Sequence, residues 1–137
     1  MFILGFPLLI ITFAIYNMIA FLTPGVSWSH DIAKIRMMSG VEWALSAGDV
    51  LVVLALVILF VEMLKATRMS RRTIMDHLLS MLLFVAMLVE FLLVKQAATG
   101  TFFLLLAISF IDVVGGFSIT IRTAQRDVEI ERVEPTA

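Results

Sequence analysis

The sequence predicts an all-α integral membrane protein, a four-transmembrane-helix antiparallel bundle. Hydrophobic residues make up 61% of the 137 residues, and charged residues only 15%. A soluble domain of this length has too much surface for its volume to bury so much apolar side chain. Four continuous apolar runs are each long enough, at about 20 residues, to cross roughly 30 Å of hydrocarbon as a helix. The runs do not alternate as membrane β-strands do.

The predicted spans follow one another with short connections. They cover residues 3–22, 44–64, 74–94 and 101–121. Pro7 falls near the start of the first span, where its missing N–H costs little. No basic residue precedes this first run and no small-x-small cleavage site follows it, so we expect a retained helix and not a signal peptide. Together the spans form one membrane domain.

The positions of lysine and arginine predict that both termini are cytoplasmic. Four of the ten basic residues lie between the second and third spans, at Lys65, Arg68, Arg71 and Arg72. Others follow the last span, in a tail over residues 122–137, which we expect to continue the helix for a turn or two and then fray. Basic residues concentrate on the cytoplasmic side of a cytoplasmic (inner or plasma) membrane. The same four residues could also contact anionic lipid headgroups.

Residues 27–40 predict a short amphipathic helix on the outer membrane surface, between the first two spans. Apolar residues recur there at helical spacing, at Trp28, Ile32, Ile35 and Met38. Polar residues take the other side, as in helices that lie in the interface. Gly40 is suited to end such a helix.

Acidic residues inside the spans are the candidates for a functional site, because an ionisable group at the centre of a membrane helix costs roughly 2.5–3.5 kcal/mol. By helix rise, Asp49 and Glu90 share a layer near the outer surface, with Tyr16 and Asn17 slightly deeper. Asp112 lies near the middle of the membrane. One interpretation is that these groups hydrogen-bond the helices together. The other is a cation or proton site open to the outer side, with Asp112 as a deeper relay.

Small residues in the fourth span predict close helix packing, at Ser109, Gly115 and Gly116. Small side chains let a neighbouring helix approach, so this face should contact protein and not lipid. Glu62 lies near the inner end of the second span, within one helical turn of Lys65. We expect these two residues to form an ion pair at the membrane surface.

Several kinds of chemistry lack the residues that they need. The chain has no cysteine, which excludes disulfides, thiolate metal sites and a cysteine nucleophile. His30 and His77 lie a whole membrane apart, which excludes a bis-histidine haem or a zinc site built on both within one protomer. No glycine pattern indicates a nucleotide, and a net charge of −1 gives no basic field for nucleic acid. We therefore expect no catalysis, cofactor or metal.

Three functions remain open. The leading hypothesis is a noncatalytic accessory or assembly subunit of a larger membrane complex, or an oligomeric membrane component, because the chain is almost all membrane helix. Its partners would be the lipid bilayer and a membrane protein or further copies of itself. The alternative is a small proton- or cation-coupled transporter or channel that uses the intramembrane acids. The third is a lipid-interacting membrane organiser that uses the outer helix and the basic connection.

Overall fold

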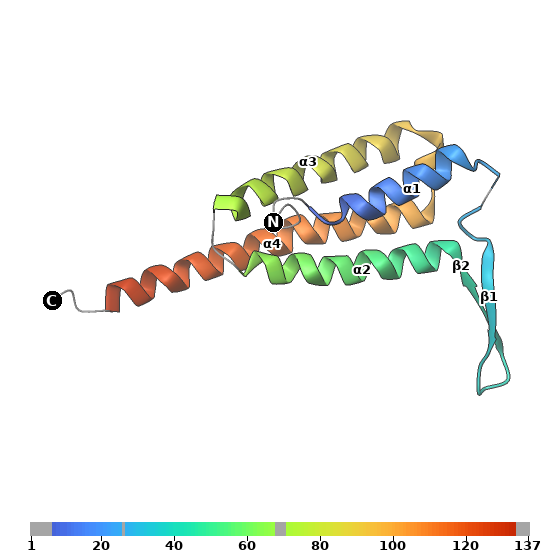
Figure 1. Cartoon of the computed structure of the whole chain (residues 1–137), viewed down its shortest axis with the longest axis horizontal. Coiled ribbons are helices and arrows are strands. Elements are labelled where there is room, and N and C mark those ends of the chain that lie inside the picture. Colours follow the sequence, from blue (N-terminus) through green and yellow to red (C-terminus); the bar gives the residue numbers. More distant parts are fainter. Residues whose placement is uncertain (1–6, 26, 68–70, 134–137) are drawn as a thin grey trace.

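The computed structural model describes residues 7–25, 27–67 and 71–133, which form a mostly helical fold with a small two-stranded sheet (Figure 1). In chain order the elements are α1 (Ile10–Leu22), β1 (Asp31–Arg36), β2 (Glu42–Ser46), α2 (Ala47–Ala66), α3 (Arg71–Leu93), the short 3-10 helix η2 (Lys95–Ala97) and α4 (Gly100–Val133). The two strands form a hairpin at one end of the bundle. We call this the hairpin end, and the other the opposite end.

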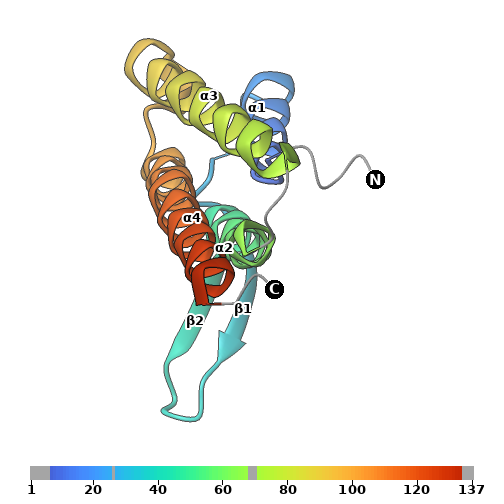
Figure 2. The same ribbon diagram turned by 90° about the vertical axis from the view of Figure 1, so that its left-hand side faces the viewer.

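The other helices are arranged around α4. It packs along both α2 and α3, while α1 makes fewer contacts with α2 and α4. Both views show α2 and α4 side by side, with α3 and α1 completing the bundle (Figures 1 and 2). The hairpin projects from the end of the bundle where α1 finishes and α2 begins.

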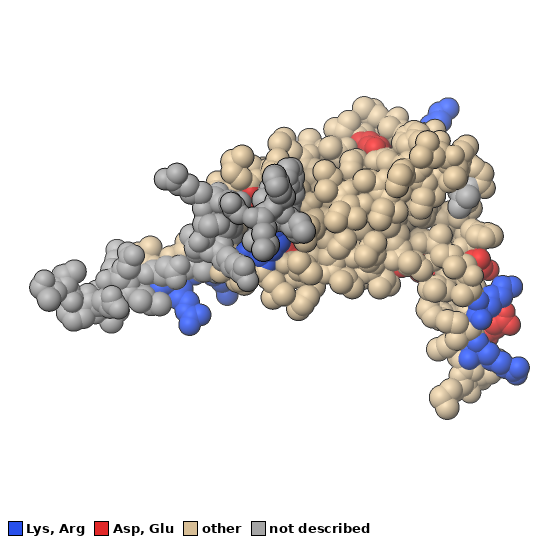
Figure 3. Space-filling model, in the orientation of Figure 1, with Lys and Arg blue, Asp and Glu red and all other residues tan. Residues whose placement is uncertain are grey.

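Three helical segments are long and apolar enough to cross a membrane: Ala47–Ala66, Ile74–Leu93 and Gly100–Arg126. Many of their large apolar side chains are exposed, which suggests a membrane-embedded protein in which lipid surrounds these side chains. On the face seen in Figure 3, charged residues gather at the hairpin and toward the C-terminal end, and few lie between.

The first predicted span is only partly described. Residues 3–6 of the predicted span 3–22 lie outside the described residues, and Pro7 and the turn that follows it precede α1. The helix itself has 13 residues. This is shorter than the roughly 20 residues that a membrane crossing needs.

The predicted amphipathic helix over residues 27–40 is wrong, because this segment contributes to a β-hairpin. The strands β1 and β2 pair antiparallel, with Ile35 opposite Trp43 and Arg36 opposite Glu42. An apolar pair and an opposite-charge pair of this kind stabilise a hairpin. Gly40 sits in the connecting turn at φ 91°, which a helix cannot contain. The helical spacing within residues 27–40 covers only β1. The residues of β2 fall partly in the predicted connection and partly in the predicted second span.

The second helix begins three residues later than predicted, because the residues before it are paired in β2. Its first turn is closed by a capping box. The Ser46 hydroxyl accepts the Asp49 N–H, and the Asp49 carboxylate accepts the Ser46 N–H, both at 3.1 Å. These two bonds satisfy backbone donors that the helix cannot satisfy itself.

The fourth helix is longer than predicted. It continues to Val133, which is farther than the turn or two expected beyond the predicted span 101–121, and it extends beyond α2 and α3 (Figure 1). Residues 122–133 contain neither glycine nor proline and several good helix formers.

The apolar core lies toward the hairpin end and is centred on Phe102, which is fully buried at the start of α4. Its ring lies 4.9 Å from that of Tyr16 in an edge-on arrangement, and 6.1 Å from that of Phe91 in a stacked one. These contacts join α1, α3 and α4. Aromatic pairs of this geometry contribute about 0.5–1.5 kcal/mol beyond their burial.

Candidate functional site: a buried ionic cluster

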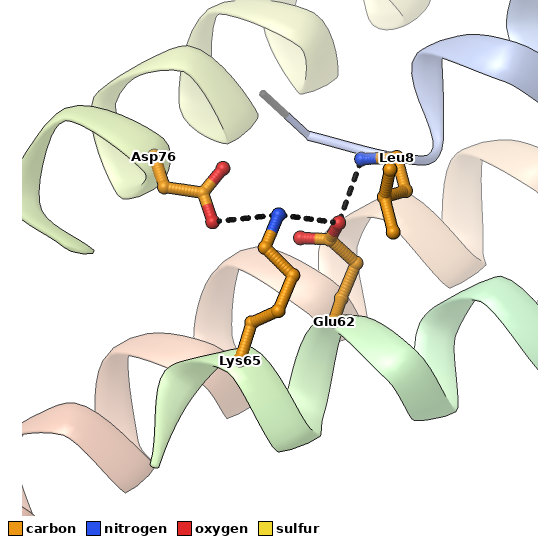
Figure 4. Close-up of polar contacts among 4 residues, drawn as sticks. All are labelled: Leu8, Glu62, Lys65 and Asp76. Carbon is orange, nitrogen blue, oxygen red and sulfur yellow. Dashed lines mark hydrogen bonds and ion pairs between the residues drawn. The ribbon is translucent and has the colours of Figure 1, made fainter. Parts of the chain in front are cut away.

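An ion triad lies inside the bundle near the opposite end. The Lys65 ammonium nitrogen Nζ is 3.3 Å from Glu62 Oε1 and 3.1 Å from Asp76 Oδ2 (Figure 4). The side chains are 8%, 3% and 11% exposed, respectively. Charges this deeply buried need partners, because removing an ion from water costs several kcal/mol.

The helices place these three side chains together for simple reasons. Glu62 and Lys65 are three residues apart near the end of α2, so they share one face of that helix. Asp76 lies near the beginning of α3, which runs antiparallel to α2 after a short connection. The end of one helix therefore faces the beginning of the next.

The backbone just before α1 also contacts this cluster. The Leu8 backbone N–H donates to Glu62 Oε1 at 2.6 Å (Figure 4). Glu62 therefore fixes the beginning of α1 against α2.

Asp112 on α4 extends the cluster. It is buried, lies within hydrogen-bonding reach of Ser80 on α3, and interacts electrostatically with Glu62, Asp76 and Lys65. Ser109 lies one turn away on α4, fully buried, and its hydroxyl has no partner among the described residues. The same is true of Asp76 Oδ1.

The chemistry of this cluster follows from its charges. Among the described side chains it holds three carboxyl groups, those of Glu62, Asp76 and Asp112, and one ammonium group. Binding of a proton to one carboxylate would reduce the excess negative charge, since an unpaired charge is costly in an apolar interior. Within the described residues, no group of His, Asp and Glu side chains has an arrangement that could hold a metal ion.

The residues predicted for an outer site are divided between two places. Asn17 and Glu90 lie within hydrogen-bonding reach of each other near the hairpin end. Asn17 Oδ1 and Glu90 Oε2 are buried without a partner among the described residues. Asp112 lies with the ionic cluster, about 14 Å deeper than Glu90 by helix rise. Buried apolar side chains, including Met87 and Leu105, occupy the core between these levels.

The other two predicted residues have structural roles. Asp49 is exposed in the first turn of α2, where its carboxylate closes the capping box. Tyr16 is fully buried, and its hydroxyl lies 2.7 Å from both the Gln96 carbonyl oxygen and Thr99 Oγ1. Thr99 Oγ1 in turn accepts the Phe102 N–H at the start of α4. Tyr16 therefore ties α1 to the connection between α3 and α4.

The three predicted packing residues lie on faces that contact other helices. A Cβ atom at Gly116 would lie 3.1 Å from His77 Cε1, and one at Gly115 would lie 3.0 Å from Met63 Cε. Glycine at both positions thus allows α4 to approach α3 and α2 closely. Ser109 is buried in the same helix.

One of the four basic residues predicted to lie at the surface between the second and third spans is buried. Lys65 was expected on the surface, both as an ion pair with Glu62 and as a headgroup contact, but it is buried in the triad. Arg68 lies outside the described residues. Arg71 and Arg72 begin α3, and the structure does not describe their side chains.

Asp76 was missed by the sequence reasoning, although the sequence held a signal for it. It lies just inside the predicted third span, and Lys65 just beyond the predicted second span. Two antiparallel helices with a short connection bring such positions together. Searching for opposite charges placed symmetrically about that connection would have found the pair.

Comparisons of the chain with models of known protein families, with curated proteins and with solved structures found no match.

Proposed function

We propose that the chain is an integral membrane protein with cytoplasmic termini, and a noncatalytic component of a membrane assembly. It would act as an accessory or assembly subunit of a larger complex, or as an oligomer of its own copies. The observation that carries this proposal is a half-exposed apolar stripe along α4. We call it the α4 stripe, and it consists of Phe110, Val114, Phe117, Ile121, Ala124 and Val128.

The spacing of the α4 stripe is that of helices that pair along their length. Its members are separated by four, three, four, three and four residues, which is a heptad pattern. The five members larger than alanine are 42–56% exposed. They are available to contact a helix of another protein or of another copy.

The stripe continues along α4 past the end of α2, where charged residues lie beside it. Gly116 lies level with Ala66, the last residue of α2, since a Cβ at Gly116 would be 3.9 Å from the Ala66 Cβ. Val128 is therefore about 18 Å beyond the end of α2 by helix rise. Exposed arginines flank this part of α4, at Arg122 and Arg126. An apolar stripe between charged residues outside a bilayer favours burial against another helix.

Native mass spectrometry of the protein extracted gently from its own membrane tests this proposal. We expect a complex with other membrane subunits, or an oligomer of the chain, and Val128→Ser should weaken it. Gln125→Ser is the matched control, because it places the same residue on another exposed face of the same helix. A bare monomer for the wild type, or equal effects of the two variants, would contradict assembly through α4.

A second candidate function is proton- or cation-coupled transport, and the buried ionic cluster favours it. The cluster has three carboxyl groups and one ammonium group among its described side chains, so it offers carboxylates that can accept a proton. Asn17 and Glu90 would form a second polar site, at the hairpin end. The apolar layer between them would have to open for transport.

Flux measurements in reconstituted vesicles test the second candidate. Asp112→Asn and Glu90→Gln keep the size of each side chain and remove its charge, so they should abolish flux while the protein still folds. Asp31→Asn is the control, because Asp31 is exposed in the hairpin and away from both groups. Wild-type flux in both Asp112→Asn and Glu90→Gln would rule this function out.

A further inference from the structure

A cleft of about 680 Å³ lies at the hairpin end, between β2 and the beginnings of α2 and α4. Trp28 and Trp43 are part of its wall, and Asp49 is the one charged residue among its described lining residues. Its other polar groups are serine and threonine side chains from three segments of the chain. The cleft shares no residue with the α4 stripe or the ionic cluster.

The cleft is amphipathic. At one side Val52, Val53 and Leu104 line it, and Val53 and Leu104 are also exposed on the outer surfaces of α2 and α4. The Asp49 carboxylate and the hydroxyl groups lie at the first turns of these helices. A ligand that fits would have a polar head among the first turns and an apolar chain along the helices.

The residues that line the cleft indicate that the polar head of the ligand is a cation. A carboxylate and the faces of tryptophan rings both attract cations. Trp28 is held rigidly, since its ring is stacked on that of Tyr16 at 4.6 Å with an interplanar angle of 9°. Trp43 is partly exposed on β2. Both helix N-termini here are already capped, α2 by Ser46 and α4 by Thr99, which leaves them little capacity to bind an anion.

We propose that this cleft binds an amphiphile with an amine or ammonium head and an alkyl chain. The head lies against Asp49 and the tryptophans, and the chain follows Val53 and Leu104. The ligand is either a membrane lipid with an amine headgroup or a free long-chain amine. Binding requires that the helices lie in a membrane but not that the protein assembles through α4.

Tryptophan fluorescence measures occupancy of the cleft directly, because Trp28 and Trp43 are the two tryptophans of the chain and both line it. The full chain would be placed in nanodiscs that contain brominated phosphatidylethanolamine or brominated phosphatidylglycerol, whose chains quench tryptophan. In a second arm, octylamine or octanol would be added to nanodiscs of unlabelled phosphatidylglycerol.

We expect brominated phosphatidylethanolamine to quench tryptophan at about threefold lower mole fraction than brominated phosphatidylglycerol. A difference in affinity of this size corresponds to one partly exposed cation–π or ion-pair contact. Asp49→Asn removes the charge but keeps an oxygen that can cap α2, and should abolish this preference. Glu42→Gln is the matched control, since Glu42 lies on β2 outside the cleft lining, and it should keep the preference.

The two arms separate the sources of the ligand. A preference in the lipid arm identifies a lipid headgroup, and a saturable response to octylamine but not octanol identifies a free amine. Leu104→Phe narrows the apolar side of the cleft and should weaken quenching while Asp49 is unchanged. This variant gives a second test if Asp49→Asn does not fold. Equal responses to amine and non-amine amphiphiles in both arms, or a preference that survives Asp49→Asn, would overturn the proposal.

Discussion

Lys65 Nζ lies 3.1 Å from Asp76 Oδ2, and this contact joins the end of α2 to the beginning of α3. The same nitrogen holds Glu62, whose carboxylate also receives the Leu8 amide before α1. Segments from three parts of the chain therefore depend on one buried ammonium group. Removing a single member of such a group leaves the others without compensation, which costs more than the whole group contributes.

Lys65→Met should destabilise the protein by about 3–5 kcal/mol, because Glu62 and Asp76 would remain buried without their shared cation. Unfolding in sodium dodecyl sulfate, followed by circular dichroism, measures this loss. Lys95→Met is the control, since Lys95 is exposed in η2. The triple variant Lys65→Met, Glu62→Gln, Asp76→Asn should recover part of the stability. Equal stability of Lys65→Met and Lys95→Met would show that the triad is not buried in solution.

Tyr16→Phe should destabilise the hairpin end by about 0.5–1.5 kcal/mol, because the part-buried hydrogen bonds of the Tyr16 hydroxyl with the Gln96 carbonyl and the Thr99 hydroxyl would be lost. The same unfolding measurement applies. Thr23→Val is a control that also removes a hydroxyl, but this hydroxyl is exposed and bonds to Ile19 within its own helix. If the two variants lost equal stability, the Tyr16 network would not be important for the fold.

The long apolar helices could be predicted from the sequence because their signal is local. A run of about 20 apolar residues needs no knowledge of the rest of the chain. The residues at which helices begin were less predictable. The start of α2 depends on Ser46 and Asp49 closing its first turn, and on the pairing of residues 42–46 with β1. The hairpin requires two segments to be considered together, and helical spacing within one of them favoured the wrong structure.

The burial of the ionic cluster was not predicted for the same reason. Glu62 and Lys65 are close in sequence, so their pairing was foreseen. Their burial depends on Asp76 and the Leu8 amide, which reach them only through packing of α3 and α1. The capping role of Asp49 was not predicted because the helix was expected to start at residue 44, whereas it begins at Ala47.

Gly48→Ala should disrupt the contact between α2 and α4 at the hairpin end. A Cβ atom there would collide with the Thr101 side chain and lie 3.1 Å from the Trp28 carbonyl oxygen. Overpacking of this kind costs about 1–3 kcal/mol. Gly100→Ala is the matched control, since nothing lies within 4 Å of its added Cβ. Tryptophan emission should shift in the first variant and not in the second, and an unchanged spectrum in both would contradict this close approach.

Gly40→Ala should open the hairpin without affecting the bundle. Gly40 has a φ of 91°, where an L-residue with a Cβ is disfavoured by roughly 1–2 kcal/mol. The Met37 N–H donates to the Val41 carbonyl at 2.8 Å across this turn, so exchange of the Met37 amide should become about tenfold faster. Gly25→Ala is the control, because its added Cβ meets no atom within 4 Å and its φ is not positive. The midpoint of global unfolding should stay constant in both variants, because the described hairpin strands pack little against the bundle and β1 is exposed throughout. Unchanged Met37 exchange in Gly40→Ala would mean that the turn adopts another conformation, and the hairpin register would then have to be revised.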